Sequence, residues 1–244
     1  MAIGSPVFAE TIFHTALQMG LQCYIFGFKF TTCLLMKNPE NIEFLIFDLG
    51  NVIIDIDYDF SINELKKLLP VQKHGLTADF FTSGFHKDFE KGLISSEEFR
   101  KEIRTLFEEN WTNQQIDHIW NSLLREIPQE RIDLIKLLRK NYQTAVLSNT
   151  NQIHVEKFDE ILQQNTSEKS LFDLFDVVFL SHEMGLAKPD VAIYETVLKK
   201  IAVSPDKVLF FDDLAANLEG AKKTGIQTYQ ISHQKGLVEF FQFG

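Results

Sequence analysis

Cysteine is nearly absent from this sequence, because its 244 residues include only two, and both precede residue 36. Disulfides therefore cannot hold the rest of the chain together, and paired cysteines cannot form a metal site there. Basic residues are also few: 24 Lys and Arg stand against 34 Asp and Glu, which gives a net charge of -10. This charge argues against a partner that is a nucleic acid or an anionic membrane. A phosphorylated ligand would need a cation or a nearby lysine to be bound.

The first 35 residues lack charge over a long stretch, since no acidic or basic residue lies between Thr11 and Phe28. A signal peptide is disfavoured because no basic residue precedes Lys29. A membrane helix is disfavoured because several polar residues and glycines interrupt the segment. We expect Met36 to be the natural start and residues 1–35 to be an over-extended N-terminal segment, with a membrane tether as the alternative. A cytoplasmic location follows if the segment is neither a tether nor an export signal.

The first clear element is a short apolar run, Phe44 to Phe47, which is typical of a strand buried on both faces. It ends on Asp48, and Gly50 and Asn51 follow where the chain must turn. In an open α/β sheet, ligands bind at this end of the strands. A buried strand that ends in a lone acid is costly unless the acid has a partner or a function.

A long stretch of helical sequence then interrupts the strand pattern. Helices are expected over 59–69, 96–109 and 113–124, and the last two open with capping boxes at Ser95/Glu98 and Thr112/Gln115. A crossover between neighbouring parallel strands needs far fewer residues. We therefore expect residues 59–127 to be an inserted helical module above the end of the first strand, on a core made of residues 36–58 and 128–244.

From residue 128 onward, expected helices and strands alternate. The expected strands are 144–147, 177–180, 207–211 and 226–231, and the expected helices are 128–138, 189–201 and the segment that ends at Thr224. Such alternation is typical of a parallel sheet with right-handed crossovers. The sequence therefore predicts an α/β fold.

Polar side chains stand at or just after the ends of these strands, namely Asp48, Ser148, Lys188, Asp212 and Asp213. These ends share one edge of a parallel sheet. Clustered carboxylates repel one another unless a cation lies between them, and oxygen ligands without His or Cys indicate a hard ion such as Mg²⁺. Together with the hydroxyl and the ammonium group, they predict a phosphoryl-binding site. The carboxylate of Asp48 would then be placed to attack phosphorus.

Four segments, FDLGNVIID, LSNT, GLAKPD and FFDDLAANLEGA, resemble in this order the signature motifs of the haloacid dehalogenase (HAD) superfamily. They span Phe44 to about Gly225, and the helical insertion resembles the C1 cap of that family. The resemblance implies a Rossmann-like parallel sheet with an inserted helical C1 cap, and Mg²⁺-dependent phosphatase activity through an aspartyl-phosphate. FDLGNV and the later segment FEKGLISSEEF are most similar to the branch typified by alpha-D-glucose-1-phosphate phosphatase. That branch implies a small phosphorylated metabolite, with sugar 1-phosphates first, as the partner.

The resemblance also implies a role for each matching residue. Asp48 corresponds to the nucleophile and a metal ligand, and Lys188 to the ammonium that balances its charge. Ser148 and Asn149 correspond to groups that hold the phosphoryl oxygens. The remaining metal ligands by resemblance are the Gly50 carbonyl, Asp213 as the principal acid, and Asp212 as a second ligand or a holder of water.

The chain departs from the family pattern at Gly50. Most phosphatases of the family carry an Asp there, two residues after the nucleophile, as the general acid and base. Such catalysis contributes about 10²- to 10⁴-fold in rate. Its absence is consistent with a slower enzyme, with a substrate that has a good leaving group, or with a proton donor from the cap. It is also consistent with a catalytically weak protein that only binds its ligand.

Other interpretations remain open from the sequence alone. A haloacid dehalogenase would not need the two acids of the last motif for a metal, a mutase would need the missing acid, and receiver modules place their acidic pair before the phospho-accepting Asp. Each site residue also has a structural interpretation: Ser148 can cap a turn, Lys188 can be a solvated charge, and the paired acids can cap a helix. His182 is expected at the rim rather than in catalysis. In the cap, Phe85, His86, Phe89 and Glu90 are candidates for substrate contact, although core packing explains both phenylalanines equally well.

Overall fold

The computed structural model describes residues 23–24, 34–35 and 39–242 of the chain. The chain divides into two compact units, Ile42–Gln234 and a smaller one formed by Met1–Asn41 with Lys235–Gly244. Within the smaller unit, strand β1 (Cys23–Tyr24) pairs with β2 (Leu34–Leu35) in antiparallel fashion, and helix α11 covers Gly236–Phe241. Apart from the four residues of β1 and β2, the segment 1–35 lies outside the described residues, and so do the expectations made for it.

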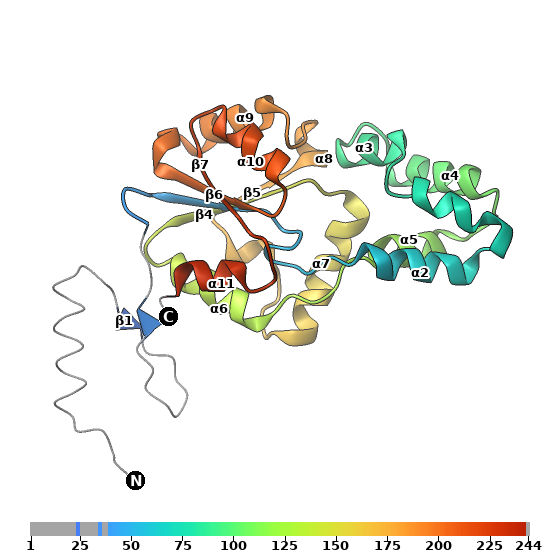
Figure 1. The fold of residues 1–244 in the computed structure, drawn as a ribbon, viewed down its shortest axis with the longest axis horizontal. Coiled ribbons are helices and arrows are strands. Elements are labelled where there is room, and N and C mark those ends of the chain that lie inside the picture. The colour runs from blue at the N-terminus through green and yellow to red at the C-terminus, as the bar shows by residue number, and fades with distance from the viewer. Residues whose placement is uncertain (1–22, 25–33, 36–38, 243–244) are drawn as a thin grey trace, which may run out of the picture. The chain divides into compact units, whose positions relative to one another are not determined.

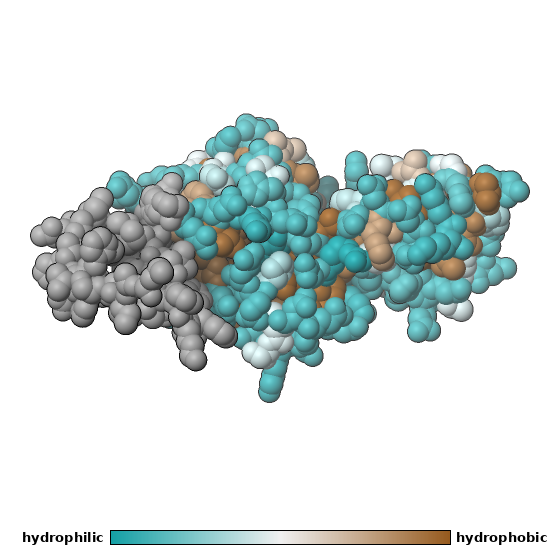
Figure 2. Space-filling model, turned by 60° about the horizontal axis from the view of Figure 1, so that its bottom comes forward, coloured by the Kyte–Doolittle hydropathy of each residue, from teal (hydrophilic) through white to brown (hydrophobic). Residues whose placement is uncertain are grey.

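No helix among the described residues is long and apolar enough to cross a bilayer. The face of the molecule shown in Figure 2 is largely hydrophilic outside the residues drawn in grey. Large hydrophobic side chains that are exposed lie mostly in the helical insertion, with two in the rest of the chain: Tyr58, Phe60, Leu68, Val71, Leu93, Leu214 and Tyr229. One of these, Tyr58, lines the cavity described below.

A five-stranded parallel sheet forms the centre of the larger unit (Figure 1). Its strands, in the spatial order β5-β4-β3-β6-β7, are β5 (Val177–Leu180), β4 (Gln143–Ser148), β3 (Phe44–Phe47), β6 (Val208–Asp212) and β7 (Gln227–Gln230). Every residue of β3 is buried, because β3 is the central strand and pairs with β4 and β6. The predicted α/β fold with a parallel sheet is confirmed.

Helices cover both faces of the sheet (Figure 1). Helices α9 (Val191–Ile201) and α10 (Ala215–Lys222) lie on one face, and α6 (Gln129–Leu138) and α7 (Gln152–Asn165) lie on the other. Short helical segments complete the core: α8 (Ser181–Met184), η2 (Phe172–Leu174) and η3 (Pro205–Lys207). Helix α7 was not expected from the sequence, although its buried residues Ile153, Phe158, Ile161 and Leu162 follow helical spacing.

The helical insertion between β3 and β4, here called the cap, has a hydrophobic core of its own. Its elements are α2 (Tyr58–Leu68), the 3₁₀-helix η1 (Val71–Asp79), α3 (Gly84–Glu90), α4 (Ser96–Phe107) and α5 (Asn113–Asn121). The cap core contains Leu65, Phe80, Phe89, Phe99, Ile103, Phe107, Ile116 and Trp120, all buried. Both capping boxes are confirmed, whereas η1 and α3 were not expected, and the domain boundaries at residues 58 and 128 remain a prediction.

Two cap helices end earlier than the sequence predicts. Helix α4 stops at Phe107 because Glu108 adopts a left-handed conformation with φ of 51°. Helix α5 stops at Asn121, and Leu124 instead forms an antiparallel bridge with Ile56. This bridge joins the two connections through which the chain enters and leaves the cap.

The C-terminal end of α3 contacts the core at α8. The Ser181 hydroxyl donates to the Glu90 carbonyl at 2.5 Å. Gly92 follows with φ of 65°, and a Cβ at this position would lie 2.1 Å from the His182 carbonyl oxygen. Only glycine permits both the backbone conformation and the close approach. This contact fixes where α3 stands relative to the carboxyl ends of the strands.

Asp55, in the loop that follows β3, is buried and paired with an arginine. Its Oδ1 lies 2.7 Å from a guanidinium nitrogen of Arg131, whose side chain is buried. Arg131 also donates to the carbonyls of Ile53 at 3.1 Å and Gln234 at 2.6 Å. The arginine thereby holds the loop that follows β3 against α6.

Candidate active site

The carboxyl ends of β3, β4 and β6 bring the predicted side chains together. Asp48 follows β3, while Ser148 and Asp212 are the last residues of β4 and β6. Asp48, Asp212 and Asp213 each offer a carboxylate oxygen within 4.8 Å of the others. The structure therefore gathers three acids from two neighbouring parallel strands, as the sequence indicates.

Lys188 lies between two of these carboxylates. Its Nζ is 2.8 Å from Asp48 Oδ1 and 2.7 Å from Asp212 Oδ2, and the side chain is almost fully buried. Burial alone would lower the pKa of Lys188, but the carboxylates of Asp48 and Asp212 outweigh it and hold the pKa above its usual value. The lysine is therefore a permanent positive charge within the site.

The same burial acts on Asp48 in the opposite sense. Burial raises the pKa of Asp48, Lys188 opposes this increase, and Asp212 adds to it. The net result is a pKa of about 7. A carboxylate must be ionised to attack phosphorus. A further cation next to Asp48 would favour the ionised form, so the electrostatics of the site suit a bound cation.

The two acids at the end of β6 differ in how their oxygens are used. Asp212 accepts hydrogen bonds from Lys188 Nζ, from Asn217 Nδ2 at 3.0 Å on both oxygens, and from the Leu214 amide at 2.8 Å. Asp213 accepts from Asn51 Nδ2 at 2.9 Å and lines the cavity beside Asp48. Asp48 and Asp213 could therefore hold a divalent ion directly, whereas the oxygens of Asp212 are engaged by the protein.

Ser148 and Asn149 stand beside the acids but make different contacts. The Ser148 hydroxyl is buried and lines the cavity, and its one hydrogen bond within the described part of the chain is a long one, 3.5 Å to the Asn149 carbonyl. The Asn149 amide donates to the Lys188 carbonyl and accepts from the Lys188 amide, both at 2.9 Å. Ser148 is thus free to donate to a ligand, while Asn149 positions the lysine. The role of Asn149 as a phosphoryl ligand remains a prediction.

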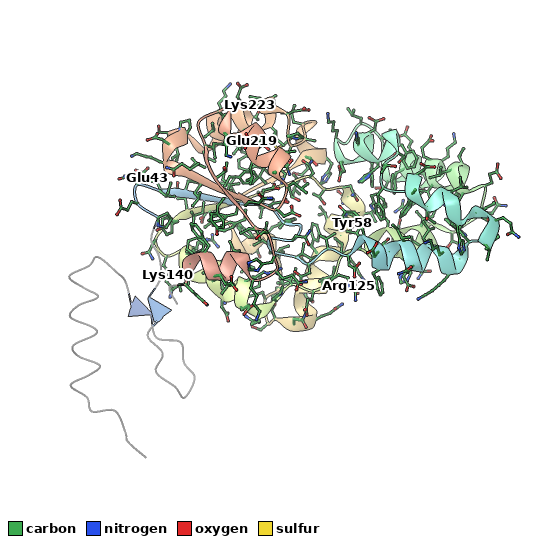
Figure 3. The ribbon with its side chains drawn as sticks, in the orientation of Figure 1. Glu43, Tyr58, Arg125, Lys140, Glu219 and Lys223 are labelled. Carbon is green, nitrogen blue, oxygen red and sulfur yellow. The ribbon has the colours of Figure 1, made fainter. Side chains whose placement is uncertain are left out.

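A cavity of about 270 Å³ lies over these residues. Core residues that line it include Asp48, Gly50, Asn51, Ser148, Asn149, Lys188 and Asp213, and cap residues include Tyr58, Phe81, His86 and Glu90. Figure 3 labels Tyr58, at the first turn of α2, where the cap meets the core. The core side of the cavity is charged. The cap side supplies the aromatic rings of Tyr58 and Phe81, the imidazole of His86 and the carboxylate of Glu90.

The four cap candidates for substrate contact divide into two pairs. His86 and Glu90 line the cavity, whereas Phe85 and Phe89 pack with the cap core and against Phe99. This division follows from the helical repeat, because residues four apart share a face. His182 lies on α8 and is not among the residues that line the cavity.

Sequence reasoning missed three contributors to the site: Asn51, Asn217 and Tyr58. Asn51 adopts φ of 54°, a conformation that Asn tolerates, and its amide orients Asp213 while accepting from the Ile56 amide at 3.1 Å. An Asn in a turn directly after a strand is a weak signal for such a role. Nothing in the sequence signalled Tyr58.

Comparison with known proteins agrees with this geometry. Residues 42–225 match the family described as haloacid dehalogenase-like hydrolase. A D-ribitol-5-phosphate phosphatase from Bacteroides thetaiotaomicron is 31% identical over 189 residues, which is 78% of this chain and 91% of that protein. A glyceraldehyde 3-phosphate phosphatase from Pyrococcus furiosus is 25% identical over 208 residues, covering 80% and 83% of the two chains. A solved HAD family enzyme from Bacteroides thetaiotaomicron, in complex with magnesium and inorganic phosphate, has a TM-score of 0.71 and 35% identity over 78% of this chain and 93% of that one.

Proposed function

Because the chain belongs to the haloacid dehalogenase-like hydrolase family, we propose that it is an Mg²⁺-dependent phosphatase of small phosphorylated polyols and sugars. The observation that carries this proposal is the placement of Asp48, Ser148 and Lys188 around one cavity, next to the acid Asp213. A nucleophile, a hydroxyl donor, an ammonium group and a further acid that can share a cation with the nucleophile are the parts that phosphoryl transfer requires. The phosphatase names of the relatives and the magnesium and phosphate in the related structure support it.

In the proposed reaction, each of these residues has a separate role. The Asp48 carboxylate attacks phosphorus and carries the phosphoryl group as an aspartyl-phosphate, which water then cleaves. Ser148 donates to a phosphoryl oxygen, and Lys188 neutralises charge on the nucleophile and on the transferred group. Mg²⁺, when bound by Asp48 and Asp213 with the Gly50 carbonyl, would supply further positive charge for the phosphoryl oxygens.

The cavity sets the size of the substrate. A volume of about 270 Å³ under a cap suits a phosphate group on a short carbon skeleton and favours it over a phosphoprotein or nucleic acid. The motif FDLGNV favours sugar 1-phosphates, and the relative named for D-ribitol 5-phosphate favours a phosphate at the end of an open chain. We place both classes in the proposed substrate range.

Phosphate release from a panel of these compounds, with Mg²⁺ or with EDTA, tests the proposal. We expect metal-dependent release by the wild type and background release by Asp48→Asn. The control variant Asp59→Asn changes an exposed acid near the start of α2 and should keep full activity. A folded wild-type protein that binds Mg²⁺ but releases no phosphate from any compound would refute the proposal and favour a protein that only binds its ligand.

A further inference from the structure

The cap side of the cavity carries an ion pair that the proposed mechanism does not use. His86 and Glu90 lie one turn apart on α3, and His86 Nε2 is 3.2 Å from Glu90 Oε1. His86 Nδ1 lies 2.7 Å from the Phe81 carbonyl oxygen. Because a carbonyl only accepts, Nδ1 carries a hydrogen, and a proton on Nε2 makes the ring a cation beside the carboxylate. The Nε2 proton is held by Glu90, and it passes to a ligand in the cavity when Nε2 exchanges Glu90 for an oxygen of that ligand.

The other ionisable groups that line the cavity are less suited to donate a proton at neutral pH. Asp48, Asp213 and Lys188 are committed to the phosphoryl and cation side. Burial lowers the pKa of His154 to about 4, so this ring is neutral. Although part of the Tyr58 ring is exposed, loss of water around its hydroxyl and nearby carboxylates raise its pKa to about 12, which makes this hydroxyl a weak acid. Among the described residues around the cavity, this leaves the pair on α3.

We propose that His86 gives the leaving group its proton and that Glu90 positions the ring and holds its charge. This inference rests on the proposed phosphatase function. As Asp48 attacks phosphorus, the ester P–O bond breaks, its electrons remain on the leaving oxygen, and that oxygen takes the proton from His86 Nε2. The neutral ring then takes a proton from the water that attacks the aspartyl-phosphate. That step breaks the Asp48–phosphorus bond, releases phosphate and restores the imidazolium.

The surroundings of His86 keep it protonated near neutral pH. Burial lowers its pKa, but Glu90 and the Phe81 carbonyl more than offset this effect, so its pKa lies above the usual value. Lys87 on the same helix opposes protonation, and the charge of His86 in turn lowers the pKa of His154 on α7. With an alcohol as the leaving group, kcat is therefore expected to fall as pH rises through the pKa of His86.

The dependence on the leaving group tests this assignment. p-Nitrophenolate is a stable anion at neutral pH and leaves without a proton. The leaving group of D-ribitol 5-phosphate is an alkoxide, which needs a proton as the P–O bond breaks. We expect His86→Gln to lower kcat for D-ribitol 5-phosphate by about 10²-fold or more, and to change kcat for p-nitrophenyl phosphate little. Hydrolysis of p-nitrophenyl phosphate by the wild type, and its loss in Asp48→Asn, report on the proposed function independently.

Three further variants sharpen the test. Glu90→Gln should move the alkaline limb of the kcat profile for D-ribitol 5-phosphate to lower pH, because it removes the charge that favours the imidazolium. Gly50→Asp in the His86→Gln background should restore part of the lost rate, since Gly50 lines the same cavity and a Cβ there would have only the Ile56 side chain nearby, at 3.4 Å. His118→Gln, an exposed cap histidine away from this cavity, should change neither substrate.

Several outcomes would overturn the assignment. Equal losses of kcat on both substrates would assign His86 a structural role, and an increase in KM alone would make it a binding contact. A loss specific to the alkyl substrate in Tyr58→Phe, but not in His86→Gln, would identify the tyrosine as the donor. A wild type that hydrolyses only the aryl phosphate would remove the need for a donor altogether.

Discussion

Replacing Lys188 by Met should destabilise the protein in a way that depends on pH. Lys188 Nζ contacts both Asp48 and Asp212 and is the positive charge among three acids whose oxygens lie within 4.8 Å. Met fills a similar volume but leaves the carboxylates uncompensated. Removing one partner of a buried ion pair costs about 3–5 kcal/mol. We expect the loss in the free energy of unfolding to approach this size above pH 7 without Mg²⁺, where Asp48 is ionised.

The sign of the pH dependence follows from the carboxylates. In the wild type, burial already raises the pKa of Asp48 from 3.8 to about 7, although Lys188 opposes the shift. Without Lys188 the folded-state pKa rises further, so the folded state binds protons more tightly than the unfolded state. Below about 7 Asp48 is protonated in both folded proteins, so the part of the deficit that comes from its charge is small there and grows as pH rises above 7. Mg²⁺ should reduce it, because an ion bound to the folded state stabilises that state.

Urea unfolding near pH 5 and near pH 8, with EDTA or with Mg²⁺, measures this prediction. The control is Lys207→Met, which removes an exposed ion pair with Glu43 and should change stability little at either pH. A Lys188→Met protein as stable as the wild type near pH 8 in EDTA would refute the argument. A deficit that is equal at both pH values would show that the loss comes from packing rather than from charge.

Two other predictions concern the cap and its contact with the core. His154 has a pKa of about 4 in the folded state against 6.5 for the unfolded chain, so its contribution to stability is complete above 6.5 and is lost as pH falls through 4. His154→Gln should therefore remove about 3 kcal/mol of the destabilisation that acid causes over this range. Urea unfolding at several pH values measures this, and an unchanged acid profile would contradict it. Gly92→Ala should lower the free energy of unfolding, measured by thermal unfolding, by at least about 1 kcal/mol and should raise KM, because φ is positive and a Cβ would lie 2.1 Å from the His182 carbonyl oxygen. The control Gly75→Ala, with open space around it, should be neutral. Equal effects of the two variants would refute the role of this contact.

The sequence predicts the core half of the site because the carboxyl ends of parallel strands lie at one edge of the sheet. A buried apolar run such as Phe44 to Phe47 indicates a parallel strand, and parallel strands end at one edge. The acid after that run and the polar residue that ends β4 must then lie near each other, whatever the loops do. Asp48, Ser148 and Asp212 follow this rule, and the structure brings them together.

The cap half follows no such rule, and its assignment depends on packing that has no local signal. The segment with Phe85, His86, Phe89 and Glu90 contains two aromatic and two ionisable side chains, and packing on the cap core and docking of α3 on α8 decide which pair faces the cavity. That docking depends on a glycine with positive φ far from the strands in the sequence. Chemistry fixed to the sheet edge is therefore predictable from one strand at a time, whereas the side chains that the cap turns toward the cavity depend on tertiary contacts such as Ser181 with Glu90 and His154 with Trp120. A change in these contacts would alter the cap side of the cavity while leaving the nucleophile and the lysine in place.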